Sequence, residues 1–412
     1  MNNKLSFSQI YSTSLTIFAM LFGAGNLVLP PALGMACGDK VLYGLSGFLL
    51  TGVLVPFLGL IAIILFNGNY SEFFGRIGKA PGFVITFLCM LMLGPLLIMP
   101  RIVTLSYAML LPFMPTAFSS LPEFYSRLIF SLFFLGLAFL ATYKPSRILG
   151  LVGKVLSPLK VLCIITIILI GVFSGSSATG VSETTQALFA QGIILGYQTV
   201  DLLGTIFFGS IIISLLLGNR IATPVLMKSI IKTTMISGVL ACSFLTLIYT
   251  GMSYLGVFHG AGLAHLDESQ LFSQLCFRIL GYHGAALIGF TVFLACFITA
   301  IALAAVVGEY TQKELFFKKI SYPVALFLVL GTCLIPSLYG FAAVVSFSKP
   351  LLFIMYPIIL AITLCNLLYK FYGIKIIKTP VALVALIVIG YNIYEYTVTT
   401  VLVIKEVVHN EI

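Results

Sequence analysis

The stretch FGAGNLVLPP, Phe22–Pro31, interrupts a segment that otherwise reads as a membrane-spanning helix. Inside a bilayer every backbone N–H and C=O group needs a partner within the protein, so a broken helix is tolerated only where it is buried in protein or borders a watery cavity. The stretch therefore indicates either a kink required for packing or part of a binding site. One break alone does not decide between them, because Gly and Pro are common in membrane helices.

The composition excludes a soluble protein. Of the 412 residues, 60% are hydrophobic and 8% are charged, whereas a soluble domain carries about 25% charged residues. Apolar runs longer than the ~20 residues needed to cross a bilayer recur along almost the whole chain. They predict an all-α polytopic membrane protein of about eleven spans. The spans lie near residues 10–36, 41–66, 82–111, 126–142, 148–174, 190–218, 229–258, 284–309, 321–341, 349–369 and 380–404.

The net charge of +10 reports membrane topology. With the N-terminus in the cytoplasm, most of the 22 Lys and Arg residues fall on the inner side, as the positive-inside rule requires. We therefore expect the lipid bilayer, and no nucleic acid, as the macromolecular partner. An odd number of spans leaves the C-terminus outside. The first segment continues past its apolar core through two prolines, which is not typical of a cleaved signal peptide.

A second interruption, QGIILGYQTVDLLGTIFFG at residues 191–209, falls in the sixth predicted span. An offset of five spans reverses orientation in the membrane, as in a five-helix inverted repeat. Interrupted segments at corresponding positions of two halves indicate a transporter's site at the middle of the membrane. We predict one transmembrane domain over 1–412, with repeats near 10–174 and 190–369 and an additional helix near 380–404.

Both breaks contain groups suited to ligand binding. Half-helix ends expose unpaired N–H groups that attract anions and unpaired C=O groups that attract cations. Gly23 and Gly25 allow close approach to the backbone, and Asn26 supplies an amide. Asp201 is ionisable within a span, which suggests a function. It is a candidate to ligate a cation, to carry a coupling proton or to receive a substrate ammonium, and the alternative is a structural carboxylate bonded by backbone or by Thr199.

Other polar residues within the spans have two interpretations each. Tyr197 and Gln198 either line a pocket or pack at an interface. Thr299 either ligates sodium or bonds back to its own helix. Arg101 is interpreted as structural, paired with a carboxylate or bonded to backbone carbonyls that the nearby Pro95 and Pro100 free. Glu309, at the inner end of the eighth span, is interpreted as a gate or an interfacial ion pair.

The sequence lacks recognisable catalytic motifs. The sequence has no P-loop, no H-E-x-x-H and no nucleophile–base constellation, so we predict no enzyme activity and no cofactor. His259, His265 and His283 near one outer loop do not have the spacing of a closed zinc site. A passive channel would require a polar stripe along several helices, and the spans are too uniformly apolar for one.

Five stretches together resemble the bacterial branched-chain amino acid:cation symporter family (LIVCS). They are FAMLFGAGNLVLPPALG (18–34), GPLLIMPR (94–101), GYQTVDLLG (196–204), ITAIALAAVVGEY (298–310) and KPLLFIMYPI (349–358). The resemblance implies a secondary active transporter in the bacterial inner membrane. It would import leucine, isoleucine and valine with sodium by alternating access, on a LeuT-like 5+5 inverted-repeat core.

The resemblance also implies site residues. Substrate contacts would come from Gly23, Ala24, Gly25, Asn26, Tyr197, Gln198, Thr199 and Asp201. A sodium ion between helices one and eight would use the carbonyls of Ala19 and Phe22 and the hydroxyl of Thr299. The chain departs from the family in having Ile298 where a second hydroxyl residue is common, and in lacking a twelfth span. Proton coupling through Asp201, and another apolar substrate such as methionine, remain alternatives.

Overall fold

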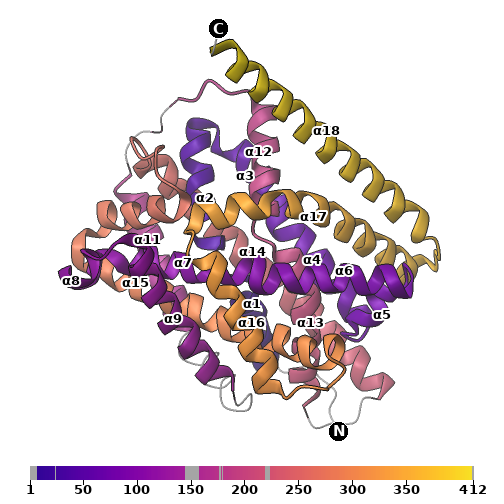
Figure 1. The fold of residues 1–412 in the computed structure, drawn as a ribbon. Coiled ribbons are helices and arrows are strands. Elements are labelled where there is room, and N and C mark those ends of the chain that lie inside the picture. The colour runs from indigo at the N-terminus through magenta and orange to yellow at the C-terminus, as the bar shows by residue number, and fades with distance from the viewer. Residues whose placement is uncertain are drawn as a thin grey trace.

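The computed structural model describes residues 7–410 except 24, 144–156, 176–177, 179 and 219–222, and its described elements are all helical (Figure 1). Seven helical segments are long and apolar enough to cross a membrane, and three shorter apolar helices accompany them. This confirms the prediction of an all-α polytopic membrane protein. Each predicted span falls on one helix or on consecutive helices, although the start of the predicted span 148–174 lies outside the described residues.

The first half of the chain contains α1 Phe7–Leu21, α2 Gly25–Cys37, η1 Gly38–Lys40, α3 Val41–Leu49, η2 Leu50–Leu54, α4 Val55–Leu65, α5 Tyr70–Gly75, α6 Lys79–Leu91, η3 Met92–Leu96, α7 Ile98–Leu110, η4 Leu111–Phe113, α8 Thr116–Ser119, α9 Glu123–Thr142 and α11 Ser157–Phe173. The second half contains α12 Thr185–Tyr197, α13 Asp201–Leu217, α14 Pro224–His259, α15 Glu268–Tyr310, η6 Thr311–Leu315, α16 Tyr322–Ser337, α17 Phe341–Tyr372 and α18 Lys378–Asn410.

The two interrupted spans each pack along one continuous span from the other half of the chain. Helices α1 and α2 both lie against α14, while α12 packs on α3 and α13 packs on α4. Glycines bring these backbones together: a Cβ on Gly192 would lie 1.9 Å from the Gly44 carbonyl oxygen, and one on Gly256 would lie 1.9 Å from that of Pro31. Small residues at such crossings allow the close van der Waals packing on which helix association in membranes depends.

A kink in the third predicted span turns α7 toward the two breaks. Gly94, within η3, has non-helical backbone angles, and Pro95 follows it. Proline removes a backbone donor and disrupts the helical hydrogen-bond ladder, which accounts for the kink. Beyond it, α7 packs mainly on α15. Helix α15 itself is divided at Gly281, where φ is +66°, into a short first piece and the eighth predicted span.

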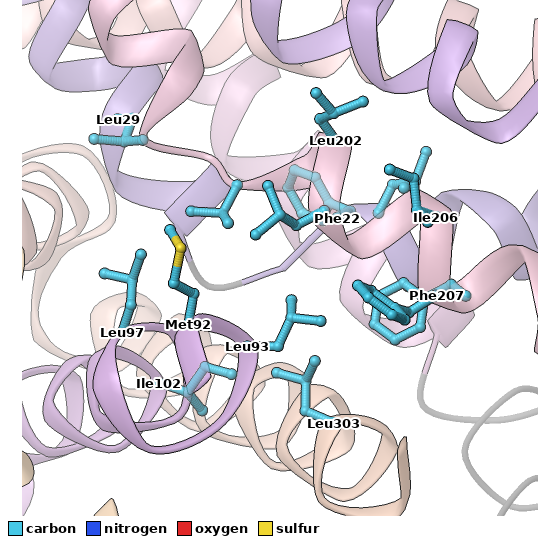
Figure 2. Packing of buried hydrophobic residues seen from close by; sticks show 14 of the residues in the cluster. Phe22, Leu29, Met92, Leu93, Leu97, Ile102, Leu202, Ile206, Phe207 and Leu303 are labelled. Atoms are coloured by element: carbon cyan, nitrogen blue, oxygen red, sulfur yellow. The ribbon is translucent and has the colours of Figure 1, made fainter. Parts of the chain in front are cut away.

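Apolar side chains close the space around the breaks. Phe22 at the first break, Leu93 and Ile102 on the kinked span, Leu202 on α13 and Leu303 on α15 are all buried and converge there (Figure 2). Helix α18 lies apart, along the edge of the bundle against α17 (Figure 1). The centre of the molecule is therefore formed by the interrupted helices and the helices that contact them.

Candidate functional site between two interrupted helices

The first break separates α1 from α2 at the residues where the sequence predicted it. The Leu21 carbonyl at the end of α1 accepts from Gly23 N at 2.9 Å and from the side-chain amide of Asn26 at 2.7 Å. Pro30 and Pro31 lie inside α2. Since proline has no N–H, the carbonyls one turn earlier, on Asn26 and Leu27, lack the helical donors that they would otherwise have. The break thus leaves backbone carbonyl groups without helical donors near the middle of the span.

The second break separates α12 from α13 and is held in an unusual conformation. Val200, which is buried, has φ +60°. The left-handed region costs a residue with a Cβ roughly 1–2 kcal/mol, and for a β-branched residue it is a genuine outlier. Beside it, the Thr199 hydroxyl donates to the Gly196 carbonyl at 2.9 Å and accepts from Asp201 N at 3.4 Å. Strain of this kind is common at hinges and ligand sites.

Asn26 and Asp201 connect the two breaks. The Asn26 Nδ2 atom donates to Asp201 Oδ2 at 2.9 Å and lies 2.6 Å from the Tyr249 hydroxyl oxygen. The Tyr249 hydroxyl is also 3.5 Å from Asp201 Oδ2. All three side chains are buried. This network joins α2, α13 and α14, and Tyr249 is a member that the sequence analysis missed because an aromatic residue in an unbroken apolar helix carries no local signal.

A small cavity of about 40 Å³ lies at the meeting point of the breaks. Among the predicted site residues, those lining it are Gly23, Gly25, Asn26, Thr199, Asp201 and Thr299. A cavity of this size accommodates a water molecule or an ion. Small-molecule pockets generally measure about 300–1,000 Å³, so in this conformation the cavity is too small for a leucine-sized molecule.

The other predicted site residues that the structure describes do not line the cavity. The Tyr197 ring packs on that of Tyr356, with 4.2 Å between centroids. The Gln198 backbone carbonyl accepts a bond from Arg101, while its side chain is buried nearby. Ala19 and Phe22 are on α1 and at its end, outside the lining set. Ala24 lies outside the described residues, and the ligand roles of all these residues stay predictions.

Thr299 reaches the cavity from α15. Its hydroxyl donates to the Ala295 carbonyl at 3.0 Å, so it bonds back to its own helix. Its methyl carbon lies 3.9 Å from where a Cβ on Gly23 would stand, which places it beside the first break. A hydroxyl oxygen that donates its hydrogen keeps its lone pairs as acceptors. Back-bonding and sodium ligation are therefore compatible at this residue.

Arg101 on α7 also lines the cavity and contacts both breaks. Its Nη1 donates to the Gln198 carbonyl oxygen at 2.6 Å. The acceptor is a backbone carbonyl, as one of the two predicted alternatives required, but it belongs to Gln198 at the end of α12 and is not one of the carbonyls freed by Pro95 and Pro100. Glu309 forms an exposed ion pair with Lys313 four residues on, in agreement with the interfacial interpretation.

A second, larger cavity lies toward the ends of the spans that the charge pattern places outside. It measures about 350 Å³, and its walls include Thr104 and Tyr107 on α7, Ser269 and Ser273 on α15, and Phe341 at the start of α17. The Phe341 ring also lies 5.2 Å from Arg101 Cζ. Phe341 therefore borders both this cavity, which we name the vestibule, and the guanidinium beside the breaks.

Comparisons with known proteins identify relatives along almost the whole chain. A family model described as "Branched-chain amino acid transport protein" matches residues 6–410. The branched-chain amino acid permease BraB of Bacillus subtilis is 31% identical over 376 residues, which is 90% of this chain and 82% of that protein. The branched-chain amino acid transport system 3 carrier protein of Pseudomonas aeruginosa is 29% identical over 400 residues, 93% of this chain and 86% of that protein. The chain therefore belongs to the branched-chain amino acid transport protein family, a family of membrane transporters.

Proposed function

We propose that this protein is a secondary active transporter that imports branched-chain amino acids together with a cation, by alternating access around the two breaks. The observation that carries the proposal is the meeting of two interrupted helices at one polar cavity, joined by the Asn26–Asp201 bond. Broken helices at membrane depth are characteristic of transporter binding sites. The names of the relatives, a permease and a carrier of branched-chain amino acids, support the substrate class.

The two cavities support a mechanism with distinct conformations. The vestibule has the volume of a small-molecule pocket, whereas the cavity at the breaks has room for a water or an ion. In the proposed cycle the amino acid reaches the breaks from the vestibule in a conformation where the central cavity is wider. It leaves on the other side after the outer path has closed. The strained backbone at Val200 supports a hinge role for the second break.

A LeuT-like core of two inverted repeats is proposed on the packing of the interrupted spans. The first span packs on the seventh, and the sixth packs on the second. An operation that exchanges spans one to five with spans six to ten converts each of these pairs into the other. A 5+5 inverted repeat predicts this reciprocity, and the same operation would exchange the two breaks.

Sodium is proposed as the coupling ion, at a site near Thr299 and the end of α1. The supporting observations are the position of Thr299 on the cavity and the end of α1 beside it, where Met20 and Leu21 line the same cavity. Helix C-termini favour cations. Proton coupling through Asp201 is a second candidate, because this carboxylate is buried at the break and its hydrogen-bond partners are neutral groups. An apolar amino acid such as methionine is the alternative substrate.

Uptake into proteoliposomes tests the proposal. Labelled leucine, isoleucine, valine and methionine are offered under an inward sodium gradient or an inward proton gradient, imposed separately. Sodium-driven accumulation competed by the three branched-chain amino acids is expected. Proton-driven accumulation would instead indicate that the coupling ion is a proton carried by Asp201. Absence of gradient-driven accumulation in vesicles that bind substrate would exclude secondary active transport.

Thr299 provides the test of the ion site. Thr299→Ala should raise the sodium concentration needed for half-maximal uptake by about tenfold or more, because one oxygen ligand is lost. Thr299→Ser retains the hydroxyl and should stay near wild type. Thr332→Ala is the control, since Thr332 is exposed on α16 and bonds back to its own helix in the same way. Equal sodium dependence in all variants would place the ion elsewhere.

A further inference from the structure

Arg101 is a buried cation with two unused donors. Only 3% of its surface is exposed. Its Nη1 bonds the Gln198 carbonyl, but among the described residues neither Nε nor Nη2 has a hydrogen-bond partner. Nε–H and Nη2–H point the same way from the edge of the planar guanidinium. They form the side-on fork that matches the two oxygens of a carboxylate.

Among the described residues, no carboxylate forms an ion pair with this fork. Asp201 and Glu268 are near enough to act on the charge of Arg101. Within the part of the chain that the structure describes, however, the ion pairs are Arg127–Glu123 and Lys313–Glu309, so neither carboxylate pairs with it. Asp201 instead accepts from Asn26. A buried charge without a partner is costly, and this cost would be relieved by a negatively charged ligand.

The guanidinium of Arg101 lies close to the first break. A Cβ on Gly25 would lie 3.1 Å from Arg101 Cζ and 3.3 Å from Nη2, so the guanidinium packs against the backbone where α2 begins. The first N–H groups of a helix lack intrahelical acceptors and carry positive partial charge. The Phe341 ring, which lines the vestibule, also lies 5.2 Å from Arg101 Cζ. Two positive groups, the guanidinium and the N-terminus of α2, thus lie together on the central cavity.

We propose that the Nε/Nη2 fork of Arg101 is the subsite for the α-carboxylate of the transported amino acid. This inference rests on the proposed function and deepens it. The carboxylate accepts two parallel N–H···O bonds from the fork when Phe341 moves aside, and Nη1 keeps its bond to Gln198. Asp201, on the same cavity, is then the acceptor for the substrate ammonium. The pocket's two opposite charges are complementary to a zwitterion.

Binding of leucine and leucinamide to the purified full-length chain tests this subsite. Leucinamide keeps the side chain and the amine but replaces the carboxylate with a neutral amide. At about pH 6.5 both amines are protonated. Wild type should bind leucine about 100-fold more tightly than leucinamide, the difference expected for lost bonds to a charged group. Arg101→Gln should weaken leucine binding by a similar factor, leave leucinamide binding nearly unchanged and so bring the ratio close to one.

Arg101→Lys keeps the buried charge without the fork. Its preference for leucine over leucinamide should fall to about tenfold. Arg278→Gln is the control: Arg278 is on the first piece of α15, bonds two backbone carbonyls at 2.8 and 2.7 Å, and should leave the ratio unaltered. Thermal unfolding of each variant in the same detergent identifies one that has misfolded. If Arg101→Gln misfolds, the ratio of leucine to leucinamide affinity in wild type and in Arg101→Lys still tests the subsite.

The outcomes separate the two proposals. If wild type binds leucine and leucinamide equally, the carboxylate subsite is overturned while transport stands. An unaltered ratio in Arg101→Lys and Arg101→Gln overturns the role of Arg101. If leucine binding instead requires chloride and ignores the carboxylate, an inorganic anion occupies the fork and the proposal is overturned. Failure of stable wild-type protein to bind leucine, isoleucine or valine overturns the proposed function and this subsite with it.

Discussion

The Asn26 amide donates to the Asp201 carboxylate across 2.9 Å, joining two residues 175 positions apart in the chain. Asn26 is in the first turn of α2 and Asp201 is the first residue of α13. The bond therefore links the second halves of both interrupted helices. A conformational change that separates α2 from α13 has to break this buried bond or replace it with bonds to substrate, ion or water.

Replacing Asn26 tests that link. Asn26→Ala removes the 2.9 Å donor to the Asp201 carboxylate, while the Leu21 carbonyl keeps its bond from Gly23 N. Depriving a buried carboxylate oxygen of its donor costs about 1–3 kcal/mol. We expect a lower unfolding temperature in detergent and strongly reduced uptake. Asn392→Ala is the control, because Asn392 bonds only its own helix, α18, at 2.8 Å. Equal behaviour of the two variants would show that the link contributes nothing.

The strain at Val200 can be isolated by comparing two truncations. In a helix, Gly is less stable than Ala by roughly 0.5–1 kcal/mol. At φ +60° the order should reverse, with Val200→Gly more stable than Val200→Ala by about 1 kcal/mol. Both variants lose the two γ-methyl groups, and Val200→Gly also loses Cβ, so a second valine pair that loses the same atoms is needed to isolate the backbone effect.

The matched pair is Val257→Ala and Val257→Gly, within α14, where the ordinary order should hold. Chemical unfolding in mixed micelles measures all four variants. If Val200→Ala is the more stable of its pair, the left-handed backbone at the second break is not strained as described.

The crossing of α12 and α3 depends on the absence of a side chain at Gly192. A Cβ there would lie 1.9 Å from a backbone oxygen, which cannot move like the end of a flexible side chain. Gly192→Ala should destabilise the protein by about 1–3 kcal/mol. Gly136→Ala, in α9, meets no atom within 4 Å and should instead gain up to about 1 kcal/mol from helix propensity. Thermal unfolding of the two variants should show opposite shifts.

Tyr70 predicts a pH dependence at the connecting helix α5, outside the spans. Its hydroxyl donates to Glu314 at 2.6 Å, and burial together with that carboxylate raises its pKa above the ordinary value of 10.0. Below about pH 10 the phenol is protonated in both the native and the unfolded chain. Above it the unfolded chain ionises first, so native stability falls as pH rises.

The Tyr70→Phe variant should consequently lose less stability than wild type between about pH 9 and pH 11. The exposed Tyr125 provides the control variant, Tyr125→Phe, measured in the same buffers. Parallel curves for wild type and Tyr70→Phe would contradict the assignment of a buried, carboxylate-bonded phenol at this position.

Local sequence signals led to much of the candidate site. Gly23, Asn26, Thr199, Asp201 and Thr299 stand out because each is small or polar within an apolar run, and the structure places all five on one cavity. Residues without such a signal were missed. Tyr249 and Phe341 look like ordinary members of apolar helices, and their positions depend on contacts with segments far away in the chain.

Arg101 was identified from the sequence, but the geometry of its donors was not. Its rarity within a span identified it, and its bond to a backbone carbonyl was expected, but the unpaired fork was not. Likewise, Gly25 was expected to admit close approach, and only the structure shows that the approaching group is the guanidinium. Donor geometry of this kind depends on how α7 turns after the Gly94 kink.

The sequence by itself determined that the chain is a helical membrane protein, where its spans lie and where two of them break. These properties are local, since hydropathy, proline and glycine act through the backbone of their own segment. Only the tertiary structure decided that the breaks meet and which side chains meet there. That outcome depends on the packing of α2 on α14 and of α13 on α4, which joins residues far apart in the chain.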